Sequence, residues 1–189
     1  MKVLAVVGSP RKGGNSDTLV EAILEGASGA GAEAEKLYLN SLQIRGCQAC
    51  NACRSSVDDE CVQDDDMTRI VHPRLRSCDA FVIATPIYYF GVSAQTKLFL
   101  DRWYALGGQE GDPHALQGKR AAIAIAYADA DPFSSGAAHA MATFRDAINW
   151  VGARLVGVVH GSAEARGEIA RNQALIVQAR QLGRKLVAP

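Results

Sequence analysis

Short apolar runs rich in β-branched residues alternate with helical patterns along the chain, and this alternation restricts the possible folds more than any other feature. The apolar runs cover residues 2–8, 32–39, 80–86, 120–128 and 154–161. Helical patterns cover about residues 16–29, 65–77, 93–106, 136–151 and 168–187. Except for the second, the runs are hydrophobic throughout, which is typical of parallel strands covered on both faces. The pattern predicts an α/β fold, a three-layer doubly wound domain around a five-stranded parallel sheet in the order 2-1-3-4-5.

Composition supports one domain and excludes two classes of partner. The 189 residues are 48% hydrophobic and 21% charged with a net charge of zero, which predicts a single domain over residues 1–189 with a cysteine-rich insertion at about 45–62. Balanced charge argues against nucleic acid as a partner. No apolar run approaches the ~18 residues of a membrane span, so no membrane partner is expected. The first run is interpreted as a buried strand and not a signal peptide, and the expected location is cytoplasmic.

The loop after the first strand has the composition of an anion site. It reads GSPRKGGNSDTL over residues 8–19, and its glycines allow a tight turn into a helix. Gly14 stands where a nucleotide-triphosphate loop needs lysine, and no G-x-G-x-x-G pattern is present. We therefore expect a monophosphate at the helix N-terminus, bound by Ser9, Arg11, Asn15, Ser16 and Thr18. The alternative is that Asn15 or Ser16 only caps the helix and Arg11 is a solvated charge.

The loop after the third strand carries three consecutive aromatic residues, Tyr88, Tyr89 and Phe90, between Pro86 and Gly91. Exposed aromatics in a row indicate a surface that covers a flat ring such as isoalloxazine or that meets another subunit. The alternative is that they fill the core or a dimer interface. Ser93 is the expected N-cap of the next helix.

Four of the five cysteines fall within residues 47–61. Cys47, Cys50 and Cys53 follow C-x2-C-x2-C, and Cys61 adds a fourth thiol. A spacing of three brings thiols to one side of a helix or tight loop, and iron–sulfur ligation uses compact runs of this kind. Zinc more often pairs two C-x2-C knuckles, and free thiols or a disulfide are further alternatives. We expect Cys78 to be a buried thiol, and Asp64, Asp65 and Asp66 to cap the following helix.

The first and third loops resemble the NAD(P)H-dependent FMN reductase branch of the flavodoxin-like superfamily. The similarity lies in GSPRKGGNSDTL, in TPIYYFGVSAQTKLFLDR over residues 85–102 and in GVVHG over residues 157–161. It implies a flavodoxin-like fold, FMN as cofactor and a homodimer or homotetramer. By position, the first-loop residues would hold the phosphate, and the ring would be bordered by Pro86, Ile87, Tyr88, Tyr89, Phe90 and Gly91. Tyr127 is a further candidate, although its loop, YADADPFSSG, departs from the glycine pair of many relatives.

The cysteine segment resembles the iron-sulfur flavoproteins of the same family. This resemblance implies a 4Fe-4S cluster held by Cys47, Cys50, Cys53 and Cys61. The expected function is an FMN-dependent oxidoreductase or electron-transfer flavoprotein that passes electrons from NAD(P)H or a reduced carrier to a small-molecule or protein acceptor. No catalytic side chain is expected, because FMN carries the chemistry.

Two alternatives to this function follow. One is a cluster-free NAD(P)H-dependent FMN or quinone reductase in which the thiols are idle. The other is of another class: a non-enzymatic flavodoxin-like electron carrier, or an interaction module held together by zinc.

Overall fold

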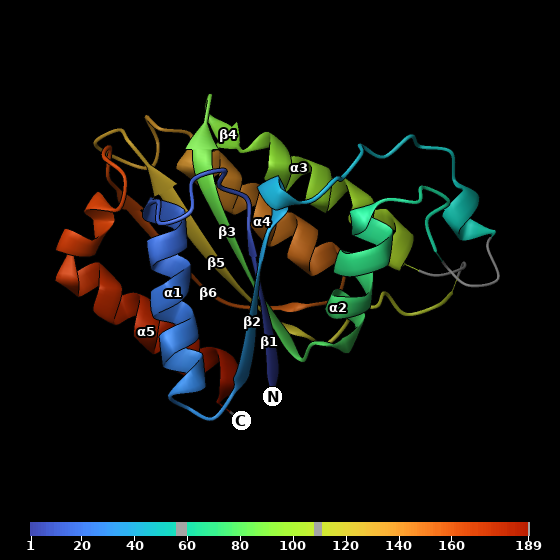
Figure 1. Ribbon diagram of the computed structural model, residues 1–189, viewed down its shortest axis with the longest axis horizontal. Coiled ribbons are helices and arrows are strands. Elements are labelled where there is room, and N and C mark those ends of the chain that lie inside the picture. The colour runs from blue at the N-terminus through green and yellow to red at the C-terminus, as the bar shows by residue number, and fades with distance from the viewer. Residues whose placement is uncertain (56–59, 108–110, 189) are drawn as a thin grey trace.

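The protein is described by a computed structural model that covers residues 1–55, 60–107 and 111–188. Its centre is a parallel sheet in the order β2-β1-β3-β5-β6, which Figure 1 shows between two layers of helices. These strands are β1 (Lys2–Val7), β2 (Glu33–Tyr38), β3 (Ala80–Tyr88), β5 (Arg120–Tyr127) and β6 (Arg154–Ser162). The five parallel strands confirm the predicted flavodoxin-like order, and no strand end differs from the predicted run by more than two residues.

One further strand was not predicted. Strand β4 (Gly91–Val92) pairs antiparallel with the end of β3 and makes a hairpin there. In Figure 1 this hairpin projects at the edge of the sheet where the other parallel strands also end.

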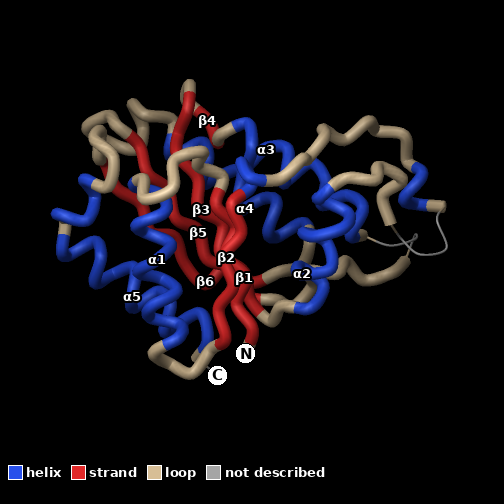
Figure 2. The backbone as a smooth tube through the Cα atoms, in the orientation of Figure 1, coloured by secondary structure: helices blue, strands red, loops and turns tan. Residues whose placement is uncertain are grey.

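The helices cover the two faces of the sheet unequally. Helices α1 (Asn15–Ser28) and α5 (Gln173–Val187) cover one face, and α2 (His72–Ser77), α3 (Ala94–Asp101) and α4 (Ala137–Trp150) cover the other (Figure 2). Alternate residues of β1 separate accordingly. Leu4 and Val6 belong to the core beneath α2, α3 and α4, whereas Ala5 and Val7 belong to the core beneath α1 and α5.

Helices α1 and α5 cross very closely. A Cβ atom built on Gly183 would lie 1.9 Å from the carbonyl oxygen of Ile23, and one built on Gly26 would lie 2.0 Å from that of Arg180. Neither position has room for a methyl group. Glycine at both positions therefore sets the distance between these two helices.

Three predicted helices are interrupted. The pattern at 65–77 forms a π-helical turn, Met67–Val71, before α2, and the pattern at 93–106 ends in a 3₁₀ turn, Arg102–Leu106. The pattern at 168–187 begins with the 3₁₀ turn Glu168–Arg171, and α5 starts after it because the Asn172 side chain accepts a hydrogen bond from the Leu175 N–H group at 3.1 Å.

The fifth predicted run is less covered than expected. The structure places it at a sheet edge as β6, where Leu155, Val156 and Val158 are half-buried. Leu155 and Val158 pack on one core and Val156 on the other, so both faces are covered as expected, but only in part, because β6 is an edge strand. Across the described residues, no helix combines the length and apolar character needed to span a bilayer.

Candidate functional site

A pocket of about 240 Å³ lies at the carboxyl ends of β1, β3 and β5, where ligands bind in sheets of this kind. Four separate segments form its wall, and eight of the twelve predicted cofactor residues lie on it: Ser9, Arg11, Asn15, Ser16, Pro86, Ile87, Tyr88 and Tyr127. The turn after β6 adds Ala163, Glu164 and Arg166. An adjoining hollow of about 580 Å³ shares Ser9, Arg11 and Arg166 with this pocket. The fold thus brings residues from distant parts of the sequence to one site.

A buried hydroxyl network locks the first loop against the start of α3. Ser93 accepts a hydrogen bond from the Thr96 N–H group, which confirms the predicted N-cap, and its hydroxyl donates to the Gly8 carbonyl at 2.7 Å. The Thr96 hydroxyl donates to that of Thr85 at 3.0 Å. A Cβ atom on Gly8 would lie 1.9 Å from Thr96 Oγ1. The two loops that border the pocket are therefore held in one arrangement.

Helix α1 begins at the pocket without a side-chain cap. Gly14 is the residue at the N-cap position, so neither Asn15 nor Ser16 caps the helix, and the capping part of that alternative was wrong. Arg11 is exposed, which is compatible with its other part. A Cβ atom on Gly14 would lie 2.9 Å from the Arg11 carbonyl oxygen, so the loop needs glycine there. The positive end of the helix dipole therefore faces the pocket beside the exposed guanidinium of Arg11, an arrangement that suits an anion.

Asp17 is a buried residue of this loop that the sequence did not single out. Its carboxylate accepts hydrogen bonds from the Gly13 N–H group at 2.6 Å and from the Tyr38 hydroxyl at 3.0 Å, and it pairs with Lys36 at 3.0 Å. Burial by itself would lower the pKa of Lys36, but hydrogen bonds to Glu21, Tyr38 and Asp17 raise it overall. Asp17 thus shapes the turn around Gly13 while Lys36 balances its negative charge.

Asn15 and Thr18 have other partners than the pocket. Both amide N–H groups of Asn15 donate to backbone carbonyls, those of Ala163 and Ala165, at 3.0 Å each, and its Oδ1 accepts from the Ile169 N–H group. Asn15 therefore anchors the turn that carries Glu164 and Arg166. The Thr18 hydroxyl donates to the Gly14 carbonyl within the helix. Phosphate contacts by these two side chains stay predictions.

The aromatic residues after β3 diverge. Tyr88 reaches the pocket, whereas Tyr89 and Phe90, which do not line it, form the tip of the β3–β4 hairpin with exposures of 99% and 61%. Both tip residues have left-handed backbones, with φ of 49° and 66°. Gly91 pairs with Tyr88 in the hairpin and also lies off the pocket wall. Ring contacts from Tyr89, Phe90 and Gly91 therefore stay predictions.

Tyr127 closes the pocket from the end of β5. Its ring stacks on His160 with centroids 5.9 Å apart, and the hydroxyl lies 3.2 Å from His160 Nδ1. Burial, followed by the charge of Asp131, raises the pKa of Tyr127. The ring is thereby held as a rigid, uncharged wall.

The four cysteines of the predicted cluster gather around a second, small pocket, which we call the cysteine pocket: Cys47, Cys50, Cys53 and Cys61. Their segment is irregular, with left-handed backbones at Ala49 and Asn51 and a 3₁₀ turn over Ala52–Arg54, so the spacing of three does not follow a helix. Figure 1 shows this segment on the side of the molecule away from α1 and α5. Part of the predicted insertion, residues 56–59, lies outside the described residues.

The thiols share a pocket but do not converge in the structure. Cys47 and Cys50 are exposed, Cys53 is buried, Cys61 is half-buried, and all are free. Within the described ranges, no three Cys, His, Asp or Glu side chains are grouped as metal ligands would be. The cluster therefore stays a prediction. The fifth cysteine, Cys78, is buried as predicted, and burial raises the pKa of its thiol to about 11.

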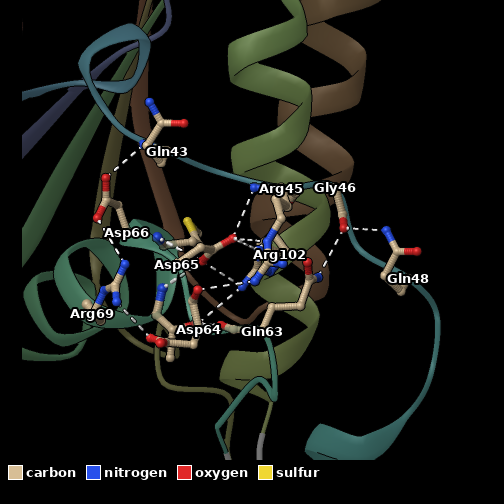
Figure 3. Close-up of polar contacts among 12 residues, drawn as sticks. Gln43, Arg45, Gly46, Gln48, Gln63, Asp64, Asp65, Asp66, Arg69 and Arg102 are labelled. Atoms are coloured by element: carbon tan, nitrogen blue, oxygen red, sulfur yellow. Dashed lines mark hydrogen bonds and ion pairs between the residues drawn. The ribbon is translucent and has the colours of Figure 1, made fainter.

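A buried ion pair ties the cysteine segment to the turn after α3 (Figure 3). Arg102 and Asp65 are joined by two hydrogen bonds, Nη1 to Oδ2 at 2.6 Å and Nη2 to Oδ1 at 3.1 Å. Asp65 also accepts from the Met67 and Thr68 N–H groups, which confirms its predicted capping role. Burial alone would raise the pKa of Asp65, but hydrogen bonds from Arg102 and from the Arg45 N–H group lower it. The ion pair itself was not predicted.

A larger hollow, of about 680 Å³, lies apart from the predicted flavin residues. Its wall includes Arg54, Tyr104, His114 and Trp150. The Arg54 guanidinium stacks on Tyr104 at 4.2 Å from the ring centroid, so this hollow borders the end of the cysteine segment.

The fold and the pocket at the strand ends define a flavodoxin-like α/β protein. Residues 1–167 match the family described as NADPH-dependent FMN reductase, and the chain belongs to this family. The resemblance inferred from the two loops is thereby confirmed.

Several curated relatives and solved structures are similar to this chain. An iron-sulfur flavoprotein of Archaeoglobus fulgidus is 36% identical over 128 residues, which cover 68% of this chain and 55% of that protein. YwqN of Bacillus subtilis, a proposed NAD(P)H-dependent FMN-containing oxidoreductase, is 31% identical over 187 residues, 97% of this chain and 98% of that one. The chain spans about half the length of the first iron-sulfur flavoproteins that it matches.

Among solved structures, the Trp repressor binding protein from Bacillus subtilis has a TM-score of 0.70 at 28% identity, covering 95% of this chain and 98% of that chain. An NAD(P)H:quinone oxidoreductase from Methanothermobacter marburgensis has a TM-score of 0.77 at 20% identity, covering 100% and 97%. Because the sequence identity to the quinone oxidoreductase is only 20%, this structural similarity shows the fold alone.

Proposed function

We propose that this protein is an FMN-dependent oxidoreductase that passes electrons from NAD(P)H or a reduced carrier to an acceptor. The observation that carries the proposal is the pocket at the carboxyl ends of β1, β3 and β5, which joins the uncapped N-terminus of α1 to Tyr88 and Tyr127. Membership of the NADPH-dependent FMN reductase family supports FMN as its ligand.

The chain's residues fit the two ends of FMN. Ser9, Arg11 and Ser16 lie beside the uncapped helix start, and they would hold the phosphate together with backbone N–H groups. Ile87, Tyr88 and Tyr127 give an apolar wall for the ring system. When bound, FMN would supply the redox chemistry, while the protein binds it, orients it and limits access of water.

We further propose that Cys47, Cys50, Cys53 and Cys61 hold a 4Fe-4S cluster. Their shared pocket and the compact spacing support this, and several curated relatives are named iron-sulfur flavoproteins. A cluster handles single electrons, so it would link the flavin to one-electron partners. The donor would then be a reduced protein carrier as readily as NAD(P)H.

The alternative of a cluster-free NAD(P)H-dependent FMN or quinone reductase is favoured by one observation. Across the described residues, the thiols do not form a ligand group. YwqN, which matches nearly the whole chain, has a name that mentions FMN and no cluster.

One preparation tests flavin and cluster together. Anaerobically purified protein is examined for its visible spectrum and assayed for iron, acid-labile sulfide and zinc. FMN with iron and sulfide supports the full proposal, and FMN alone supports the cluster-free reductase. A colourless protein that does not take up added FMN contradicts the proposal, and zinc without flavin indicates an interaction module. Steady-state oxidation of NADH or NADPH with an added acceptor argues against a purely non-enzymatic carrier.

We also propose a homodimer or homotetramer. Tyr89, Phe90 and Phe133 expose 99%, 61% and 79% of their surface, and these exposed aromatic rings support a second copy of the chain as their cover. We propose that residues 1–189 form a single domain. We also propose a cytoplasmic location, which the five free thiols support.

A further inference from the structure

Arg102 places an unpaired hydrogen-bond donor beside the four cysteines. The residue is 1% exposed and lines the cysteine pocket. Its Nε–H group has no hydrogen-bond partner among the described residues. Leaving a buried polar group without a partner destabilises a protein, and the effect is larger when the group is charged. Explanations for such a group in a native protein include a redox role and an acceptor outside the polypeptide; Trp103 Nε1 and Arg120 Nε are unpaired as well, but of the three residues only Arg102 lines the cysteine pocket.

The rest of the guanidinium is held in place, so the direction of Nε–H is set. Nη1 donates to Asp65 and to the Arg45 carbonyl at 2.8 Å, and Nη2 donates to Asp65 and to the Thr68 hydroxyl at 3.1 Å. Bidentate pairing prevents the planar group from turning. Arg45 and Asp65 lie just before and just after the four cysteines along the chain. Arg102 contacts both of them (Figure 3), so one side chain joins both ends of the cysteine segment.

The acceptor that fits this donor is an anionic sulfur-containing group. Four thiols border the same pocket. Burial by itself would lower the pKa of Arg102, but a hydrogen bond to Asp65, together with the charge of Cys61 and a hydrogen bond to the Cys61 side chain, raises it, so Cys61 lies within reach of the guanidinium. Carboxylate neighbours are already satisfied, because both oxygens of Asp65 accept hydrogen bonds from the Nη groups.

We propose that Arg102 is a positioning residue for an iron–sulfur cluster in the cysteine pocket, donating an Nε–H···S hydrogen bond to it and offsetting its negative charge. The inference rests on the cluster of the proposed function. Hydrogen bonds to sulfur and a nearby positive charge stabilise the reduced cluster, which carries one more negative charge than the oxidised one. Arg102 therefore raises the reduction potential of the cluster.

The test compares Arg102→Lys with wild type by spectroscopic redox titration, alongside iron and sulfide analysis. Lysine keeps the charge and can pair with Asp65, but it has no second N–H group along its stem. The expected result is retained iron and a roughly tenfold weaker equilibrium constant for one-electron reduction, which is about 59 mV lower in potential. Arg69→Lys is the matched control, because Arg69 is an exposed arginine paired with Asp64 in the same region.

The outcomes separate this inference from the proposed function. Wild-type protein without iron contradicts the cluster, and this inference falls with it. Wild-type and Arg102→Lys proteins with equal iron and equal potentials overturn the role of Arg102 alone. Loss of iron from a folded Arg102→Lys protein, with iron kept in Arg69→Lys, supports the positioning role.

A second variant covers the case in which Arg102→Lys does not fold. Thr68→Val removes one acceptor of the guanidinium and leaves its charge. This variant should lower the potential in the same direction by a smaller amount, and an unchanged potential there overturns the proposal.

Discussion

Arg11 and Ser16 are the side chains that contribute most directly to the proposed binding of the FMN phosphate. Arg11 supplies a full positive charge at the pocket, and Ser16 is buried beside the uncapped start of α1. Hydrogen bonds to charged groups contribute about 1.5–3 kcal/mol each. We expect Arg11→Ala combined with Ser16→Ala to weaken FMN binding by at least ~10-fold, measured by titrating apoprotein with FMN and following flavin fluorescence.

Two further variants sharpen this measurement. Arg171→Ala removes an exposed cation away from the pocket and is the control for lost charge. Thr18→Ala tests the phosphate contact that the sequence predicts for Thr18. In the structure the Thr18 hydroxyl makes a hydrogen bond within the helix, so FMN affinity should change only if the phosphate contact exists. Unchanged FMN affinity in the double variant would mean that the phosphate lies elsewhere.

His72 makes stability depend on pH in the acid range. The side chain is 3% exposed, and its Nε2–H group donates to the Arg102 carbonyl at 3.1 Å. Burial, followed by the charge of Arg102, lowers the pKa of His72 to about 4. The unfolded chain protonates this histidine near pH 6.5. Between these two pH values the unfolded state therefore binds more protons than the folded state. The contribution of His72 to stability is complete above about pH 6.5 and is lost as the pH falls towards 4.

We expect this histidine to account for about 2 kcal/mol of lost stability between pH 7 and pH 4.5. The measurement is the free energy of unfolding in urea at several pH values, and His72→Gln should show a shallower dependence than wild type. His139→Gln, which replaces an exposed histidine of α4, is the control. Parallel pH curves for wild type and His72→Gln would contradict the prediction.

At the scale of elements, the crossing of α1 and α5 predicts that a Gly→Ala substitution lowers stability, whereas helix propensity alone predicts that it raises stability. In an exposed helix, Gly→Ala stabilises by about 1 kcal/mol. At Gly183 the added methyl group would meet the Ile23 carbonyl oxygen at 1.9 Å, so the helices must separate. We expect Gly183→Ala to destabilise the protein by about 1–3 kcal/mol in urea unfolding. Gln178→Ala, at an exposed position of α5, is the control, and a stabilised Gly183→Ala protein would show that the helices can move apart freely.

The elements that could be predicted are those whose residues carry a local signal. Apolar runs located the strands because both faces of the inner strands are covered, and Ser93 was recognised as an N-cap from its neighbours in sequence. Contacts between distant residues have no such signal. Asp65 and Arg102 meet across 37 positions, and Asn15 binds carbonyl groups about 150 positions away. The predicted pocket residues were therefore mostly brought together, while the roles of Asn15, Asp17 and Arg102 needed the structure.

For the whole molecule, the β3–β4 hairpin tip is the surface that we propose for self-association. A left-handed backbone costs a non-glycine residue about 1–2 kcal/mol, and two-residue hairpin turns of this kind favour Asn-Gly. Tyr89 and Phe90 occupy both positions and are exposed, so the single chain gains little from them. Strain at exposed aromatic residues is consistent with a function outside the chain itself.

We therefore expect Tyr89→Asn combined with Phe90→Gly to have two opposite effects. Relief of the turn should raise the free energy of unfolding of the monomer by about 1–2 kcal/mol, whereas loss of both rings should weaken self-association. Sedimentation velocity measures association, and urea unfolding at low protein concentration measures monomer stability, because stability of an oligomer depends on concentration. Tyr89→Phe combined with Phe90→Tyr keeps two rings and the same backbone and should match wild type in both measurements. A double variant that is more stable yet associates as wild type does would place the subunit contact on another surface, such as the half-buried edge at β6.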